Sequence, residues 1–455
     1  MENGHSLTGQ ACPKDCAISP VLVRKADAVA NRSESMAKHM WLAVLMAIMA
    51  LGGLPSVIAT EQGGWRRGSV AIAAEGALDL TFNAGGRIVT DMGGYDQVRA
   101  VVVQPDGRIV AIGDSNLDFA LVSYTDDGRI DPGFGIDGRV VTAMGGHARA
   151  CVAAVQSDGK IVVGGGSGQT SSDFAVVRYN SDGTLDHGFG VGGKVITALG
   201  GDAQIRSLVI QPDGKIVAGG NANFDFALVR YNGDGSLDPG FGSGGTIITD
   251  LGGWDTASAV IFQPDGKIVV AGTSDGNSAL VRYTGDGRLD DRFGAGGKVI
   301  IDLGIDDKIW ALALQADGKI VAAGSIGYPG DFIVARYTGD GRLDAGFGTG
   351  GQVRTDMGGR DRAFFLAAQL DGTIMAAGTS GENMALVQYT GDGRPDPGFG
   401  VGGKVVCESD AVQRSISALT LQADGRMVAA GGSQEGDFFL ARYDRKSPVI
   451  LSRAK

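Results

Sequence analysis

Short, almost continuously apolar runs separated by polar turns dominate the chain beyond residue 76. One representative stretch contains the runs Thr246–Thr249, Ala259–Gln263, Lys267–Gly272 and Ala279–Tyr283. The runs are short, rich in Val and Ile, and therefore predict β-strands rather than helices. The Asp265-Gly266 turn between the second and third runs predicts a tight hairpin. We therefore predict a four-stranded antiparallel meander.

The predicted strands do not alternate between apolar and polar positions. An antiparallel sheet with one face in water shows that alternation, whereas a sheet covered on both faces does not. Runs such as Lys267–Gly272 therefore indicate sheets that are covered on both sides. Sheets that stack radially around a central axis satisfy this requirement.

The same stretch recurs seven times at intervals of about 53 residues. The motif Gln-x-Asp-Gly begins at Gln104, Gln156, Gln211, Gln263, Gln315, Gln369 and Gln422. The motif Phe-x-x-x-Gly begins at Phe82, Phe134, Phe189, Phe241, Phe293, Phe347 and Phe399. This periodicity predicts an all-β fold, a seven-bladed β-propeller of four-stranded antiparallel blades. An open β-solenoid is the alternative, but the capping ends that it would need are not evident. The incomplete first and last repeats predict a ring whose ends complement each other, with the closing strand left open.

Residues 185–231 carry Leu-Asp-x-x-Phe-Gly-x-Gly-Gly-Lys, then Gln-Pro-Asp-Gly-Lys and Phe-Ala-Leu-Val-Arg-Tyr. In these motifs, and over residues 76–445, the chain resembles the bacterial delta-60 repeat β-propeller family. The resemblance implies a propeller in an exported bacterial protein. It brings no catalytic residues that could be transferred to this chain.

The N-terminal segment predicts export. The apolar run Trp41–Leu54 follows Lys38 and His39 and precedes the small-residue sequence Val57-Ile58-Ala59, an order typical of a secretory signal peptide. The run is shorter than the 18 or more residues typical of a spanning helix, although a retained anchor is an alternative. We expect a secreted or periplasmic protein, with Met36 as a possible start.

The predicted organisation has four parts. These are an N-terminal extension with signal peptide (1–59), a short leader (60–75), the propeller (76–445) and a C-terminal tail (446–455).

The composition is acidic, with a net charge of −11 and no basic block. We therefore expect neither nucleic acid nor an anionic membrane as a partner. Cys151 and Cys407 follow the predicted cleavage site and fall in repeats that would not be neighbours in the ring. Two buried thiols without a disulfide between them are expected.

Familiar catalytic and cofactor motifs are absent from the repeats. His147 and His187 are the histidines beyond residue 60, too few for a Ser-His-Asp triad or a His-rich metal centre. The glycine-rich segment 188–194 matches a P-loop up to its lysine, but Val195 follows where Ser or Thr is required. We therefore predict no catalytic residue and no cofactor.

No metal ligands are predicted either. Aligning Asp286-Gly287 with an EF-hand loop places Arg282 where the first carboxylate is required. Calcium held in another geometry by the turns between blades remains an alternative.

The long connection Asp-Gly-x-Leu-Asp-x-x-Phe-Gly has a second aspartate that we expect to accept backbone N–H bonds in a tight turn. These structural aspartates are Asp131, Asp186, Asp238, Asp290, Asp344 and Asp396, together with Asp79 in the first copy. The following Phe is expected to pack between blades.

A meander places alternate connections at opposite rims. The Gln-x-Asp-Gly turn and the long connection share one rim, which we name the repeated rim because its sequence hardly changes between copies. The other two connections form the variable rim, where a binding site is expected. The candidate ligand-binding residues there are Tyr95, Asp96, Trp254, Asp255, Arg360 and Asp361.

These observations favour an exported, monomeric, non-catalytic propeller that acts as a binding or protein-interaction scaffold. Aromatic side chains beside Asp and Arg suit a carbohydrate or a protein surface. The alternative is a lyase or glycoside hydrolase that acts on a polysaccharide with carboxylates or a tyrosine. Such an enzyme would require paired acidic groups that converge at the channel mouth with shifted pKa values.

Overall fold

The computed structural model describes residues 78–169, 172–304, 306–407 and 413–444. The predicted signal peptide, leader and C-terminal tail lie outside these described residues.

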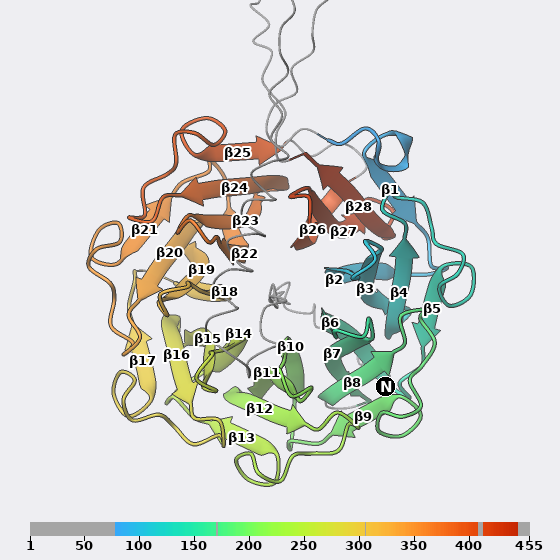
Figure 1. The fold of residues 1–455 in the computed structure, drawn as a ribbon, viewed down its shortest axis with the longest axis horizontal. Helices are drawn as coiled ribbons and strands as arrows, with labels where there is room; N and C mark the ends of the chain where they lie inside the picture. Colours follow the sequence, from blue (N-terminus) through green and yellow to red (C-terminus); the bar gives the residue numbers. More distant parts are fainter. Residues whose placement is uncertain (1–77, 170–171, 305, 408–412, 445–455) are drawn as a thin grey trace, which may run out of the picture. The chain divides into compact units, whose positions relative to one another are not determined.

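Seven four-stranded antiparallel sheets form a ring, which confirms the predicted seven-bladed propeller (Figure 1). Blade 1 comprises β2 (Asp96–Val103), β3 (Ile109–Ser115), β4 (Asp118–Tyr124) and β5 (Arg139–Thr142). Blade 2 comprises β6 (His147–Val155), β7 (Ile161–Gly168), β8 (Asp173–Tyr179) and β9 (Lys194–Thr197). Blade 3 comprises β10 (Ala203–Ile210), β11 (Ile216–Ala222), β12 (Asp225–Tyr231) and β13 (Thr246–Thr249). Blade 4 comprises β14 (Asp255–Phe262), β15 (Ile268–Ser274), β16 (Asn277–Tyr283) and β17 (Lys298–Ile301).

Blade 5 comprises β18 (Lys308–Leu314), β19 (Ile320–Ile326), β20 (Asp331–Tyr337) and β21 (Gln352–Thr355). Blade 6 comprises β22 (Asp361–Ala368), β23 (Ile374–Ser380), β24 (Asn383–Tyr389) and β25 (Lys404–Cys407). Blade 7 comprises β26 (Gln413–Leu421), β27 (Met427–Ser433), β28 (Phe438–Tyr443) and β1 (Arg87–Thr90). A 3₁₀ helix, η1 (Phe82–Ala84), precedes β1. No helix within the described ranges is long and apolar enough to cross a membrane.

The sequence repeat and the blade differ in phase. The run Thr246–Thr249 is β13, which pairs with β12 of blade 3, whereas the three runs that follow it belong to blade 4. In Figure 1 the first strand of each blade lies nearest the centre and the fourth lies outermost. The segment that follows each outermost strand therefore crosses to the next blade.

The outermost strand of blade 7 closes the ring. β1, from the N-terminal side of the repeats, pairs antiparallel with β28, with Arg87 opposite Ala441 and Thr90 opposite Phe438. The seventh copy of the repeat is thus divided between the two ends of the chain, and the closing strand that the sequence left open is identified.

The hydrophobic core consists of seven layers, one between each pair of neighbouring blades. Strand β3 is buried along its whole length, as the lack of alternation in its sequence predicted. Cys151 and Cys407 are buried in blades 2 and 6 and form no disulfide.

A buried arginine ties neighbouring blades together on the repeated rim. In blade 3, Arg230 Nε donates to Asp238 Oδ2 at 2.7 Å, and Nη1 donates to the Gly285 carbonyl of blade 4 at 2.5 Å. Its guanidinium also lies 4.3 Å from the Phe241 ring centroid. We call this unit the arginine clamp, and its other copies are centred on Arg178, Arg282, Arg336 and Arg442.

The turn aspartates complete the clamp. Oδ1 of Asp238 accepts the Gly240 N–H at 3.0 Å while Oδ2 binds the arginine. The same Oδ1 bond, to the backbone N–H two residues on, forms at Asp131, Asp186, Asp290, Asp344 and Asp396. Ser123 and Gln388 occupy the arginine position in blades 1 and 6, so the junctions that follow these two blades have no clamp.

One blade junction contains a buried tyrosine hydroxyl without a hydrogen-bond partner, so a substitution that supplies the partner should raise the stability of the protein. Tyr124, Tyr179, Tyr231, Tyr283 and Tyr389 each share a hydrogen bond of 2.7–2.8 Å with a Thr of the preceding outermost strand. The hydroxyl of Tyr337 has no partner, because Ile301 occupies the threonine position. We expect Ile301→Thr to raise the free energy of unfolding by about 1 kcal/mol in urea titrations.

Two controls make that measurement specific. Ile300→Thr, at an exposed position of the same strand, should give no comparable gain. In a Tyr337→Phe background the gain from Ile301→Thr should disappear. An equal gain in that background would show that the hydroxyl is not the cause.

The clamp at the ring closure predicts acid sensitivity. Burial opposes ionisation of Asp79, but hydrogen bonds from Thr81 and Arg426 and the charge of Arg442 lower its pKa from 3.8 to about 2. Because the folded-state pKa is depressed, this contribution is complete above about pH 4 and is lost as the pH falls toward 2. We expect the parent to exceed Asp79→Asn in unfolding free energy by about 2 kcal/mol at pH 6. Denaturant titrations should show that margin shrinking below pH 4, and a margin independent of pH would contradict this assignment.

Candidate functional site

The six predicted rim residues fall at three separate blade junctions. Tyr95 and Asp96 lie between blades 7 and 1, Trp254 and Asp255 between blades 3 and 4, and the pair at 360–361 between blades 5 and 6. Side chains of Tyr95, Trp254 and Arg360 are exposed, whereas those of the three aspartates are buried. The candidates therefore do not converge on one site, and each junction has to be considered by itself.

The junction between blades 3 and 4 presents a stacked pair of exposed aromatic rings. Trp254 is 74% exposed and Phe224 is 56% exposed, with ring centroids 5.0 Å apart and an interplanar angle of 19°. The backbones beneath them are fixed, since the Asp255 N–H donates to the Phe224 carbonyl at 2.7 Å. The backbone N–H of Trp254 donates to Asp275 Oδ1 at 2.8 Å. The rings are thus held by the scaffold and remain open to solvent.

Phe224 lies in a backbone conformation that disfavours it. Asn223 and Phe224 connect β11 to β12 with φ of 49° and 68°, the conformation of a hairpin turn that normally takes Gly second. The corresponding turn of blade 4 is Asp275-Gly276. A bulky residue at such a φ costs about 1 kcal/mol or more. The exposed ring is therefore kept at a cost to the folding free energy, as is the side chain of Leu117 at the corresponding turn of blade 1.

Three carboxylates lie at the same junction. Asp225, Asp250 and Asp255 each place a carboxylate oxygen within 4.8 Å of the other two. Burial, followed by the charges of Asp250 and Asp255, raises the pKa of Asp225. We call Phe224, Trp254 and these three aspartates the acidic–aromatic junction.

Sequence reasoning identified Trp254 and Asp255 but missed Phe224, Asp225 and Asp250. The available signal was an aromatic residue, in Asn-Phe-Asp, where the turn of blade 4 has glycine. Asp225 and Asp250 are 25 positions apart in the sequence, and the pairing of β12 with β13 brings them together.

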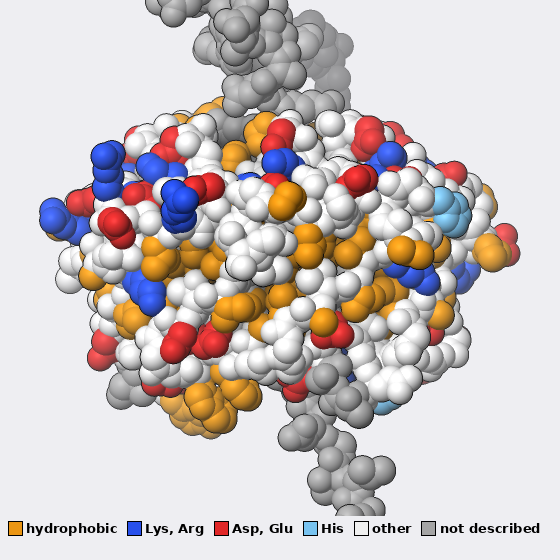
Figure 2. Space-filling model, turned by 90° about the horizontal axis from the view of Figure 1, so that it is seen from below, with side chains coloured by type: hydrophobic (Ala, Val, Ile, Leu, Met, Phe, Trp, Pro, Cys, Tyr) orange, Lys and Arg blue, Asp and Glu red, His pale blue; other side chains and the backbone are white. Residues whose placement is uncertain are grey.

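Two further junctions carry three aspartates. Asp91, Asp96 and Asp437 meet between blades 7 and 1, and Asp331, Asp356 and Asp361 meet between blades 5 and 6. Burial and then the charges of Asp91 and Asp96 raise the pKa of Asp437. In the other group, Asp331 Oδ2 is paired with Nε of Arg354. Figure 2 shows most Lys and Arg side chains toward one side of the ring, with a protruding hydrophobic group and acidic side chains at the opposite edge.

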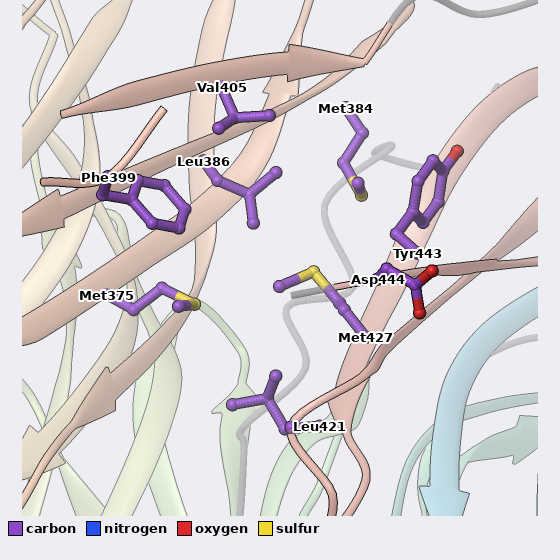
Figure 3. A pocket seen from close by; sticks show the side chains of 10 residues that line it. Met375, Met384, Leu386, Phe399, Val405, Leu421, Met427, Tyr443 and Asp444 are labelled. Carbon is purple, nitrogen blue, oxygen red and sulfur yellow. The ribbon is translucent and has the colours of Figure 1, made fainter. Parts of the chain in front are cut away.

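A small apolar cavity of about 20 Å³ lies between blades 6 and 7. Met375, Met384, Met427 and Leu421 point into this space, with Tyr443 and Asp444 at one side (Figure 3). This is a junction without an arginine clamp, and its lining offers one carboxylate and no array of polar groups. We therefore assign the cavity to imperfect packing.

The two histidines among the described residues are far from a shared centre. His147 begins β6 at the variable rim, whereas His187 lies in a long connection of the repeated rim. The described part of the chain therefore brings no histidine to the acidic–aromatic junction.

Comparison with known proteins supports a β-propeller repeat protein. The family model described as "Domain of unknown function (DUF5122) beta-propeller" matches residues 104–134, 156–189, 211–241, 263–293, 315–347 and 369–399. No curated protein matches the chain.

Solved structures show the same fold at low sequence identity. A streptogramin B lyase structure is 12% identical, with a TM-score of 0.51, and the match covers 79% of this chain and 97% of that chain. Virginiamycin B lyase from Staphylococcus aureus is 11% identical, with a TM-score of 0.51, covering 80% and 98%. The RRP9 WD40 repeats are 12% identical, with a TM-score of 0.50, covering 82% and 100%. At this identity the likeness concerns the fold alone.

The strained turn at Phe224 has a matched counterpart at Leu117, which has a φ of 67° between β3 and β4. We expect Leu117→Gly to raise the free energy of unfolding by about 1 kcal/mol because the strain is relieved. Phe224→Gly should gain less, because it also loses a stacking contact worth about 0.5–1.5 kcal/mol. Urea unfolding of both variants tests this prediction. A loss of stability in Leu117→Gly would contradict the inference that the backbone of this turn is strained.

Proposed function

We propose that the protein is an exported, non-catalytic β-propeller that binds a carbohydrate at the acidic–aromatic junction. The observation that carries this proposal is the solvent-open stack of Phe224 and Trp254, fixed by backbone hydrogen bonds on the variable rim. The apolar C–H face of a sugar ring packs well against a large flat aromatic surface.

The charges at the junction narrow the class of carbohydrate. Asp225 and Asp250, which are not fully buried, offer acceptor oxygens suited to sugar hydroxyl groups, and the buried Asp255 adds to the negative charge behind them. An anionic polysaccharide would face these carboxylates and a chain with a net charge of −11. A neutral or amino-sugar polymer of the cell envelope or its surroundings is therefore the expected ligand.

Export is part of the proposal and rests on the sequence of Trp41–Leu54 and the small residues that follow it. The N-terminal sequence of the protein recovered outside the cytoplasm should begin near Thr60. Retention of the intact chain in the cytoplasm of a bacterial host would contradict export.

Binding can be tested on an array of neutral, amino-sugar and acidic polysaccharides. The parent should bind a neutral or amino-sugar polymer, and Trp254→Ala should weaken that binding about fivefold or more, since stacking contacts of this size contribute about 1 kcal/mol or more. Phe224→Gly should weaken it as well while remaining folded.

Leu117→Gly and Tyr328→Ala serve as controls, because they change a matched turn and another highly exposed aromatic on the variable rim. Both should bind as the parent does. Equal loss in the controls, or full binding by Trp254→Ala, would refute the site. Release of shorter sugars during incubation would instead favour the lyase or hydrolase alternative.

A further inference from the structure

Aspartates occur at the blade junctions of the variable rim in a correlated pattern. Each junction combines the residue at, or immediately before, the start of a third strand with the first and last residues of a six-residue loop segment that leads into the next blade. All three positions are Asp at the junctions that contain Asp91, Asp225 and Asp331. At the junctions between blades 1 and 2 and between blades 2 and 3, both loop positions are Ala, namely Ala143, Ala148, Ala198 and Ala203.

The loop itself does not need the buried aspartate. Ala148 and Ala203 occupy the position of Asp255, are equally buried, and begin inner strands in the same way. Burying a carboxylate without a counter-charge costs several kcal/mol, so a purely structural loop would be better built with alanine. The aspartates are nevertheless present together.

Asp255 also has a buried carboxylate oxygen without a hydrogen-bond partner. Its side chain is 1% exposed, and Oδ2 accepts the Leu251 N–H at 2.6 Å. Oδ1 is buried and has no hydrogen-bond partner in the described structure. Asp96 repeats this arrangement, with Oδ2 accepting the Met92 N–H at 2.7 Å and Oδ1 without a partner. Asp307 and Asp361 share it, but the third position is Asn277 at the first of these junctions, and Arg354 pairs with Asp331 at the second.

Among the described residues, no counter-charge pairs with two of the three groups. Within the described part of the chain, Asp225, Asp250 and Asp255 form no ion pair with Lys or Arg, and neither do Asp91, Asp96 and Asp437. The third group contains Arg354 against Asp331. Val89 and Ile248 occupy the position of Arg354 in the other two groups. Among the described residues, one group therefore has a cationic side chain beside it. The other two groups have none, so a bound cation would have to come from solution.

We propose that the chain binds two calcium ions, one between Asp225, Asp250 and Asp255 and one between Asp91, Asp96 and Asp437. The donor set consists of oxygen atoms without His or Cys, which favours a hard cation over zinc. Calcium–oxygen distances of about 2.3–2.6 Å place opposite ligands about 5 Å apart, in keeping with oxygens that lie within 4.8 Å of one another.

Magnesium fits this arrangement less well. It requires shorter bonds in a near-ideal octahedron and is usually held by one or two carboxylates. The exposed carboxylates of Asp91 and Asp250 leave room for water to complete the larger calcium coordination sphere. This inference shares Asp225, Asp250 and Asp255 with the proposed carbohydrate site, but it does not use the aromatic rings, so a calcium titration without carbohydrate tests it separately.

Calorimetric titration of the EDTA-treated full chain with calcium chloride tests the proposal. We expect a stoichiometry near two, with dissociation constants of about 10⁻⁴–10⁻³ M as in other extracellular modules. Asp225→Asn should reduce the stoichiometry to one, and Asp225→Asn with Asp437→Asn should abolish binding. Magnesium chloride should bind at least about tenfold more weakly.

Asp173→Asn is the matched control, because Asp173 occupies the same strand position beside Ala198 and Ala203. It should leave the titration unchanged. No binding heat from the parent at 10 mM calcium, or an equal loss in Asp173→Asn, would overturn the proposal.

Thermal unfolding separates loss of the site from loss of the fold. In EDTA, Asp225→Asn should have the higher Tm of the two proteins, because one of three mutually repelling charges is removed. In 10 mM calcium chloride the parent should gain about 3 °C or more over its value in EDTA and overtake the variant. The same order of Tm values in both buffers would refute calcium binding at Asp225.

Discussion

Contact between neighbouring blades is the constraint on which this structure depends. No blade can bury both of its faces alone, so the hydrophobic core is divided into seven layers, each of which forms only when two neighbouring blades pack together. The arginine clamp adds a directional link to these layers, since Arg230 binds an aspartate of its own blade and a carbonyl of the next. The repeated rim has a nearly constant sequence because each clamp requires the same residues at the same positions of the repeat.

At one of the two junctions without a clamp, the packing leaves a cavity. Gln388 replaces arginine at the junction between blades 6 and 7, and the apolar cavity lies at that junction among Met375, Met384 and Met427. Ring closure by β1 completes blade 7 next to it. The variable rim carries no clamp at all, and its loops are therefore free to differ from blade to blade. This freedom is what allows one junction to combine exposed aromatic rings with three aspartates.

The fold could be predicted from the sequence because its signals are local and repeated. The Asp-Gly hairpins, the apolar runs and the spacing of Gln104 and its counterparts specify strands, turns and the number of blades without any knowledge of long-range contacts. The phase of the blades could not be predicted, because β13 continues the same sequence unit as β14 but pairs with β12. Only part of the candidate site could be predicted from the sequence. Trp254 stands out in the sequence, whereas its stacking on Phe224 and the meeting of Asp225 with Asp250 depend on pairing between strands.

We propose that the two rims have different roles, in which the repeated rim holds the ring together and the variable rim binds ligands. Hydrogen–deuterium exchange of the full chain, measured with and without calcium chloride, tests this division most directly. With calcium chloride, we expect slower exchange in the loop segments 250–255 and 91–96, and no change in the Gln-x-Asp-Gly turns. Protection of those turns, with the two loop segments unaffected, would contradict it.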